Sequence, residues 1–375
     1  MPRPILLTVS RKALSHNLNT VINGLKRSNT NSNNPGIKVW AVIKANAYGH
    51  GIEPAVEAFE QANGLGMLDL DEAIRCRQAG WTKPILLLEG FFHESDLSIV
   101  QEYDLTIAVH CTHQLEMINK ASLLKPLNVF LKLNCGMNRL GFMPEEYAKA
   151  WEYAAMLRSN GKIDTLGKMT HFSRADDDPN ETQQQLELFK RVAGQFPGPV
   201  SLCNSAATLS PQVWSGINEN TEQWVRPGIC LYGGTPFADR DANSLGLLPA
   251  QTLKASILAV RDLKAGASIG YGHQFTATEN VRMGVVSCGY ADGYPRLAGT
   301  GTPITVHGKR TRLLGRVSMD MMVADLTHIP EAGPGSEVVL WGQGGPAIDE
   351  VAAHAQTIGY ELMCAVATRV PRVII

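Results

Sequence analysis

Eight short apolar runs alternate with helical segments, and this alternation restricts the fold more than any other feature of the sequence. The runs cover residues 39–43, 64–68, 84–88, 105–109, 127–133, 163–170, 199–203 and 228–232. Apolar residues recur with helical spacing in most of the intervals, at 51–62, 70–79, 112–120, 144–160 and 180–194. Strands that alternate with helices form parallel sheets, because a crossover is needed to start the next parallel strand. The pattern therefore predicts a (β/α)8 barrel of the TIM type.

The sequence pattern changes near residue 235, where a loop-like segment runs from Thr235 to Pro249. Strand-like runs follow at 251–261, 281–287, 303–306, 311–317 and 336–341, separated by Gly-rich turns, with one short helical stretch at 347–358. A chain of 375 residues is long enough for two cores. We expect an N-terminal barrel domain at residues 1–240 and a mostly β C-terminal domain at residues 241–375.

Lys44 follows the first apolar run directly and opens a polar turn that contains glycines. Barrel strands open to ligands at their C-terminal ends, so Lys44 is expected at the mouth of the barrel. Partial desolvation there lowers the pKa of an amine, which suits Schiff-base chemistry with an aldehyde. Taken alone, a lysine that ends a strand more often reaches solvent. Tyr48 and His50 add two polar rings close by and favour the functional interpretation.

Two further strand ends carry side chains with suitable chemistry. Arg139 follows the run at 127–133, and its forked guanidinium suits a phenolate oxygen or a carboxylate. The alternative is an arginine at the barrel rim that pairs with an acidic neighbour. His171 follows the run at 163–170, where it is either functional or a hydrogen-bonded core histidine.

The last two barrel runs are the candidates for a phosphate site. Asn204 and Ser205 stand at a strand-to-helix junction, where a hydroxyl and free helix amides can bind an anion. Arg226 and the amide of Gly228 come from the next stretch, and barrels often bind phosphate between these two loops. The alternative for Ser205 is an ordinary helix N-cap.

Composition excludes several function classes. The formal net charge of −1 gives no bulk attraction to nucleic acid or to an anionic membrane. No apolar run reaches the roughly 18 residues of a membrane helix, and no GxGxxG or P-loop motif is present. The seven cysteines are scattered, so we expect no metal centre, no disulfide framework and a cytoplasmic location.

Seven motifs together resemble the alanine racemase family, and the resemblance runs from about residue 7 to Arg372. They are AVIKANAYGHG, MNRLG, THFSRAD, NSAA, RPGICLYGG, GYADGYPR and SMD, in the order of the family. The resemblance implies a barrel that binds pyridoxal phosphate and a head-to-tail homodimer with shared active sites. It also implies interconversion of L- and D-alanine, either to supply D-alanine for peptidoglycan or to catabolise alanine.

The resemblance further implies a two-base mechanism. Lys44 corresponds to the Schiff-base lysine and takes the proton from D-alanine. Tyr271, from the partner subunit, corresponds to the base on the opposite face and takes the proton from L-alanine. Arg139 would contact the phenolic oxygen of the cofactor, and Lys132 resembles a lysine that some members carry carbamylated.

The remaining roles implied by the resemblance concern the cofactor ring, the phosphate and the substrate. Arg226 would face the pyridine nitrogen, and His171 would link Arg226 to Tyr271. The implied phosphate-binding residues are Tyr48, Ser205, Gly228, Ile229 and Tyr360, with Asn204 beside them. Arg139 would meet the substrate together with Met319 and Asp320 from the partner subunit, and Tyr290 would line the entrance.

Three alternatives share the barrel. A broader racemase would act on lysine, arginine or serine, whereas bulky Tyr290 and Tyr360 favour a methyl side chain. A non-catalytic pyridoxal-phosphate carrier would lack the second domain. A fold-related decarboxylase would place a catalytic cysteine and aspartate in that domain, and we recognise no such pair in the sequence.

Overall fold

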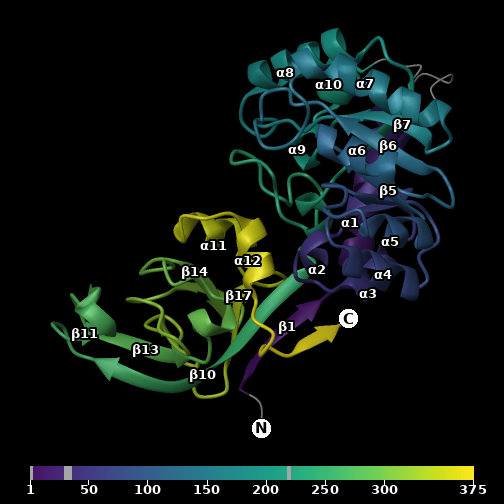
Figure 1. The fold of residues 1–375 in the computed structure, drawn as a ribbon. Coiled ribbons are helices and arrows are strands. Elements are labelled where there is room, and N and C mark those ends of the chain that lie inside the picture. The colour runs from purple at the N-terminus through teal and green to yellow at the C-terminus, as the bar shows by residue number, and fades with distance from the viewer. Residues whose placement is uncertain (1–2, 29–35, 218–220) are drawn as a thin grey trace.

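The computed structural model describes residues 3–28, 36–217 and 221–375. The chain forms a barrel lobe and a mostly β lobe, and both chain ends lie near their junction (Figure 1). None of the described helices is both long and apolar enough to cross a bilayer.

Within the described residues, eight parallel strands close a barrel, as the alternation of runs predicts. They are β2 (Ile37–Val42), β3 (Gly64–Met67), β4 (Ile85–Leu87), β5 (Leu105–Val109), β6 (Leu127–Lys132), β7 (Ile163–Met169), β8 (Val200–Ser201) and β9 (Gln223–Val225). Each strand pairs with the next, and β2 pairs with β9 through Val39 and Val225 to close the ring. Strands enclosed in this way are buried on both faces, which explains their continuous apolar runs.

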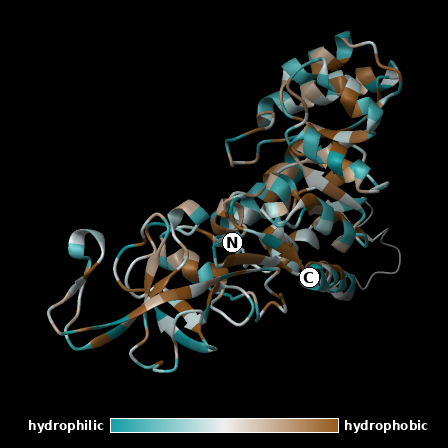
Figure 2. Cartoon of the chain, turned by 90° about the horizontal axis from the view of Figure 1, so that it is seen from below, coloured by the Kyte–Doolittle hydropathy of each residue, from teal (hydrophilic) through white to brown (hydrophobic). Residues whose placement is uncertain are grey.

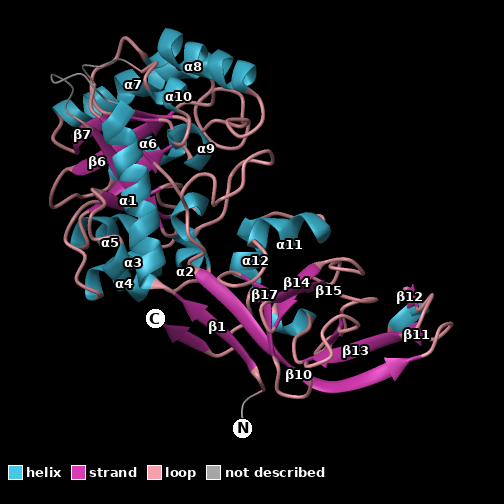
Figure 3. Cartoon of the chain, turned by 180° about the vertical axis from the view of Figure 1, so that it is seen from behind, coloured by secondary structure: helices cyan, strands magenta, loops and turns pink. Residues whose placement is uncertain are grey.

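Helices cover the outside of the barrel (Figure 3). They include α1 (Arg11–Ser28), α3 (Ile52–Ala58), α4 (Leu70–Gln78), α5 (Asp96–Glu102), α6 (Thr112–Lys120), α7 (Pro144–Ser159) and α8 (Pro179–Ala193). Helix α1 buries Leu14, Leu18 and Val21 on one face, and brown apolar segments line the inner strands in Figure 2. Burial of such side chains stabilises the fold by about 1.5–3 kcal/mol each.

The predicted eighth strand at residues 228–232 is wrong. Residues Ile229–Tyr232 form a 3-10 helix, η1, and the closing strand is the shorter β9 just before it. All four residues of η1 are buried, so their run of apolar residues has no alternation that separates strand from buried helix. The position agrees with barrels that place a short extra helix after the last strands.

The second lobe is built on a mostly antiparallel sheet. Its strands lie in the order β15 (Lys309–Arg312), β14 (Pro303–Val306), β17 (Glu337–Trp341), β10 (Gln251–Leu263), β1 (Ile5–Val9) and β18 (Arg372–Ile374), with β13 (Val281–Val286) and β16 (Met322–Asp325) continuing from β10. Strand β1 pairs antiparallel with β10 and parallel with β18, so both chain ends enter this sheet. A domain boundary near residue 240 stays a prediction.

Two helices of the second lobe face the barrel. They are α11 (Ile348–His354) and α12 (Gly359–Ala365), and α12 packs against the short element α2 (Lys44–Tyr48) after the first barrel strand. This contact brings a residue of the second lobe, Tyr360, to the mouth of the barrel.

Candidate functional site

A cavity of about 200 Å³ lies at the C-terminal ends of the barrel strands. Sixteen residues line it: Val42, Lys44, Tyr48, Leu68, Leu88, Glu89, Lys132, Arg139, Leu140, Met169, His171, Asn204, Ser205, Arg226, Gly228 and Tyr360. Ten of these are predicted site residues, and they come from five barrel strand ends and from α12. The parallel barrel and α12 therefore gather side chains that lie far apart in the sequence.

Lys44 enters the cavity from a left-handed turn. Ala45, Asn46, Ala47 and Tyr48 all have φ between 52° and 55°, a conformation that costs an L-residue roughly 1–2 kcal/mol. Asn46 tolerates this region better than most residues. Gly49 ends the turn with a φ of 76°, and a Cβ there would lie 2.3 Å from the Met363 carbonyl oxygen. Glycine is therefore required at position 49.

Hydrogen bonds around Asn46 hold the strained turn in place. The Asn46 amide donates to a carboxylate oxygen of Glu72 in α4, and the Gly51 amide donates to the Asn46 carbonyl at 2.9 Å. The Asn46 side-chain oxygen accepts from Arg75 at 3.4 Å and from the Ile52 amide at 3.3 Å. Strain that the surroundings fix in this way is typical of functional sites.

The surroundings of Lys44 and Lys132 disfavour a positive charge on either amine. Burial, reinforced by nearby Arg139, lowers the pKa of Lys44. Burial, with Arg226 and Arg139 adding repulsion, lowers the pKa of Lys132 to about 8. Glu89 opposes both shifts by attraction. A lowered pKa increases the fraction of an amine that is neutral, and the neutral form is the one that acts as a nucleophile or base.

Arg226 is buried and held rigidly among neutral oxygen atoms. Its guanidinium donates to the Ser201 hydroxyl at 2.6 Å and to the Thr170 carbonyl at 2.7 Å. Burial lowers its pKa to about 10, which leaves it charged at neutral pH. The same guanidinium lies 3.4 Å from Nδ1 of His171, whose pKa is lowered well below its usual value by burial and then by Arg226. Neutral His171 can accept this hydrogen bond at Nδ1 and carries its proton on Nε2.

Hydroxyl groups and a glycine form a cradle on one side of the cavity. The Gly228 amide donates to the Ser205 hydroxyl at 2.8 Å, and Asn204 caps the short helix α9 (Ser205–Thr208). A Cβ at Gly228 would lie 2.4 Å from the Tyr48 hydroxyl oxygen. Burial raises the pKa of Tyr48 and Tyr360, so both hydroxyls keep their protons as donors. Such a set of donors suits a phosphate, and the neighbouring amine suits an aldehyde.

Five predicted site residues do not line this cavity. Ile229 is fully buried at the start of η1, beside the cradle. Tyr271, Tyr290, Met319 and Asp320 lie in the second lobe, where Tyr271 is 75% exposed and Met319 is 53% exposed. Tyr271 opens the short helix η2 (Tyr271–His273) next to β11 (Ser268–Ile269), at the end of the lobe far from α2 (Figure 1).

Sequence reasoning missed Glu89. Among the described lining residues it is the one acidic side chain, and it faces a cluster of four positively charged groups. The signal was present in the sequence, because Glu89 and Gly90 end the predicted strand 84–88 as Lys44 ends the first one. Apolar lining residues such as Leu68 and Leu140 had no comparable signal.

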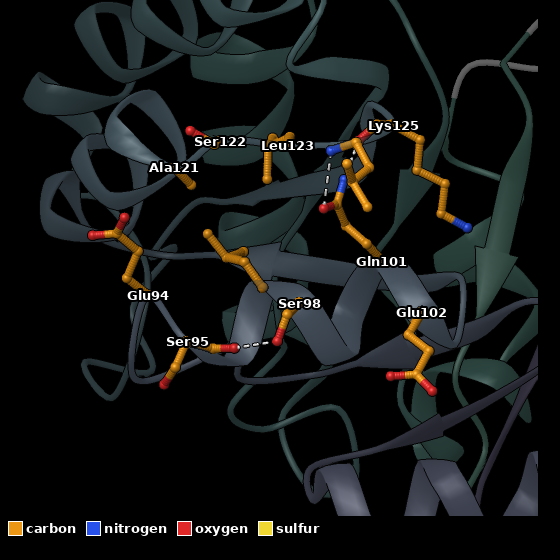
Figure 4. A pocket seen from close by; sticks show the side chains of 11 residues that line it. Glu94, Ser95, Ser98, Gln101, Glu102, Ala121, Ser122, Leu123 and Lys125 are labelled. Carbon is orange, nitrogen blue, oxygen red and sulfur yellow. Dashed lines mark hydrogen bonds between the residues drawn. The ribbon is translucent and has the colours of Figure 1, made fainter.

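A larger hollow of about 790 Å³ lies on the outside of the barrel, between α5 and residues 121–125 (Figure 4). Gln101 crosses it and accepts from the Leu124 amide at 3.2 Å. Lys125 pairs with Asp104 at 3.3 Å and reaches solvent. The described residues around this hollow include no histidine, cysteine, tyrosine or arginine. Groups with shifted pKa values gather at the barrel mouth instead, so the chemistry points there rather than to the larger volume.

Comparison with known proteins agrees with this geometry. Residues 9–236 match the family described as "Alanine racemase, N-terminal domain", and residues 250–374 match "Alanine racemase, C-terminal domain". Two curated relatives named alanine racemase, from Bordetella avium and Bordetella petrii, are 54% and 55% identical over 372 residues, with 99% of each chain covered. The crystal structure of the biosynthetic alanine racemase from Pseudomonas aeruginosa matches with a TM-score of 0.90 and 42% identity, covering 100% of this chain and 99% of that one. The chain therefore belongs to the alanine racemase family.

Proposed function

We propose that the protein is an alanine racemase that interconverts L- and D-alanine with bound pyridoxal 5′-phosphate. The observation that carries the proposal is the position of Lys44, an amine of lowered pKa that shares one cavity with a phosphate cradle and a buried arginine. Family membership supports it independently.

The residues of the cavity fit pyridoxal phosphate. Lys44 would hold its aldehyde carbon, and Arg226 would face the ring nitrogen. The implied phosphate contacts are Tyr48, Asn204, Ser205, Gly228, Ile229 and Tyr360, and the close approach of Gly228 to Tyr48 supports a site built for a small anion. When bound, the cofactor withdraws electrons from the α-carbon of an amino acid and makes its proton removable.

The protein residues then move and restrain protons. Lys44, partly desolvated, accepts or returns the α-proton on one face of the substrate. Arg226 keeps its own proton at neutral pH, so it does not donate it to the ring nitrogen. His171 takes up the orientation set by Arg226, and its Nε2 would provide the link to Tyr271 of the second copy.

Arg139 is the proposed contact for both the phenolic oxygen and the substrate carboxylate. Lys132 lies beside it, and its pKa of about 8 leaves part of its amine neutral near pH 7.5, the form that can react with carbon dioxide. Carbamylation of Lys132 would turn a positive neighbour of Arg139 into a negative one.

We further propose that a second copy of the chain completes each site. Tyr271, Tyr290 and Met319 are exposed in the second lobe, Asp320 is partly exposed there, and none of the four lines the cavity around Lys44 of its own chain. In a head-to-tail homodimer, the second lobe of one copy would cover the barrel mouth of the other. Tyr271 would then stand opposite Lys44, Met319 and Asp320 would meet the substrate carboxylate, and Tyr290 would line the entrance.

We also propose that the two domains divide at residue 240 and that the protein is cytoplasmic. The seven cysteines are free, which fits a reducing compartment.

The test measures D-amino-acid formation from a panel of L-amino acids. Purified protein should be yellow, and alanine should be racemised in preference to serine, lysine and arginine. Borohydride reduction should fix the cofactor to the peptide that contains Lys44. Label on Lys132 would overturn the assignment of the cofactor lysine, and preference for a larger substrate would replace alanine by the broader racemase activity.

A further inference from the structure

A buried carboxylate outside the cofactor cavity organises the exposed face of the second lobe. Asp292 ends the short helix η3 (Tyr290–Asp292), and its side chain is completely buried. One oxygen accepts from the Gly289 amide at 3.0 Å, and the other accepts from Nε of Arg369 at 2.8 Å. Arg3 adds a second positive charge 3.7 Å away. A buried carboxylate requires such partners, because the charge alone is strongly disfavoured.

Arg369 connects the buried carboxylate of Asp292 to the loop that contains Asp320. Its Nη2 donates to Oδ1 of Asp320 at 2.7 Å, so a single guanidinium bridges two carboxylates. Arg3 pairs with the same Asp320 oxygen at 3.2 Å and also donates to the Asp320 carbonyl. The four side chains hold two positive and two negative charges, and the planar fork of an arginine fixes the geometry between the carboxylates.

The same loop is tied to Tyr290 through the backbone. The Tyr290 amide donates to the Ser318 carbonyl at 3.0 Å, and the Ala291 amide donates to the Met319 carbonyl at 2.9 Å. Gly289 permits this approach, since a Cβ there would lie 2.4 Å from the carbonyl oxygens of both loop residues. The segment around Tyr290 and the loop at residues 318–320 therefore form one rigid unit.

We propose that Asp292 and Arg369 are positioning residues that set the loop at residues 318–320 for the site of the second copy. The inference deepens the proposed function, on which it rests. Neither residue lines the cavity around Lys44 of its own chain. Their effect passes through Asp320 and the Met319 backbone to the substrate carboxylate, and it leaves the binding of the cofactor to Lys44 unaltered.

Arg369→Ala removes the bridge while Gly289 and Arg3 still contact Asp292. We expect KM for alanine to rise and kcat/KM to fall by about 10- to 100-fold, with a smaller change in kcat and an unchanged cofactor absorbance spectrum. Amide hydrogen exchange at residues 318–321 should become faster. Arg310→Ala is the matched control, because Arg310 also pairs with a carboxylate, Glu350, in the same lobe.

Arg369→Lys keeps a positive charge beside Asp292 but cannot fork to Asp320 with the same geometry. It should fold even if the alanine variant does not, and it should show a smaller rise in the same KM. Unchanged KM and unchanged exchange in both folded variants would overturn the proposal.

Mixed dimers separate this inference from the proposed function. In a heterodimer of Lys44→Ala and Arg369→Ala chains, the one site with Lys44 receives its loop from the chain that keeps Arg369. That site should show the wild-type KM, with half the wild-type kcat per dimer. A KM equal to that of the Arg369→Ala homodimer would show that Arg369 acts on its own chain and would overturn the inference. A Lys44→Ala and Tyr271→Phe heterodimer serves as reference, because its failure to recover activity would refute the shared site itself.

Discussion

Charge balance in the cavity is decided by individual residues. Lys44, Lys132, Arg139 and Arg226 face one carboxylate, Glu89. Burial, reinforced by the nearby Arg139, lowers the pKa values of both lysines, and Arg226 adds further repulsion at Lys132. The cavity therefore combines positively charged groups, which attract anions, with lysines whose neutral form is more populated than it would be in water.

His50 shows how a buried neutral side chain links this site to the second lobe. Its Nδ1–H donates to the carbonyls of Tyr48 and Ala47, at 2.9 and 3.0 Å, and its Nε2 lies 3.4 Å from the side-chain nitrogen of Gln251 in β10. These contacts fit the neutral ring with Nε2 as acceptor. Burial lowers the pKa of His50 from 6.5 to about 4, although the two carbonyls oppose the shift.

We predict that His50 makes the protein sensitive to acid. Between pH 6.5 and about 4 the unfolded state binds a proton that the folded state does not, so stability falls as the pH falls. The loss between pH 8 and pH 5 should be about 2 kcal/mol from this residue. Urea unfolding of wild type and of His50→Gln at both pH values tests this. The variant should be less stable at pH 8 but should lose less stability on acidification, and an equal loss would contradict the assignment.

The sequence predicted a site residue where a polar side chain directly follows a predicted barrel strand. Lys44, Arg139, His171 and Arg226 each come shortly after an apolar run, and the barrel brings the C-terminal ends of its strands together around one cavity. Tyr360 lies in a helix of the other lobe, and no local pattern placed it at the barrel mouth. Only the resemblance to the family indicated it.

Among the elements, the left-handed turn at residues 45–48 was not foreseeable. Its two alanines and one tyrosine normally avoid positive φ, and only Asn46 and the flanking glycine hinted at it. Tertiary contacts overrule the local preference, since Glu72 and Arg75 from α4 both contact Asn46. The prediction of the eighth strand was wrong for a related reason, because a buried apolar run does not distinguish a strand from a short helix.

We predict that Asn46→Ala destabilises the protein by roughly 1–2 kcal/mol, since it loses both a side chain tolerant of the left-handed region and the acceptor for the Ile52 amide. Lys44 is displaced with the turn, so the affinity for pyridoxal phosphate should fall as well. Urea unfolding and cofactor titration measure the two effects. Asn119→Ala, an exposed asparagine in α6, is the control. Loss of stability no greater than in the control would mean that the turn does not depend on Asn46.

At the scale of the whole molecule, the separation of the two proposed bases is the central feature. The barrel that holds Lys44 was predictable from the alternation of strands and helices, and so was a second, mostly β domain. The pairing of β1 with β10 and β18 was not, because short apolar strands at the chain ends carry no signal for their partners. Nor does one chain show where Tyr271 acts, since its proposed role depends on a second copy.

The two bases on two subunits should govern opposite enantiomers. Lys44 is proposed to take the proton from D-alanine, and Tyr271 of the second copy from L-alanine. In Tyr271→Phe, exchange of the α-proton with deuterated solvent should therefore persist for D-alanine and be lost for L-alanine. A general base accelerates proton transfer by about 100- to 10,000-fold, so mass spectrometry resolves the difference between the two exchange rates easily.

The equilibrium constant between the enantiomers stays at one, because they have equal free energy, and only the two exchange rates differ. Tyr290→Phe alters an exposed residue at the proposed entrance, so any effect should slow both exchanges equally. Equal loss for both enantiomers in a folded, cofactor-loaded Tyr271→Phe dimer would instead make Tyr271 a packing residue and leave the opposite face without its proposed base.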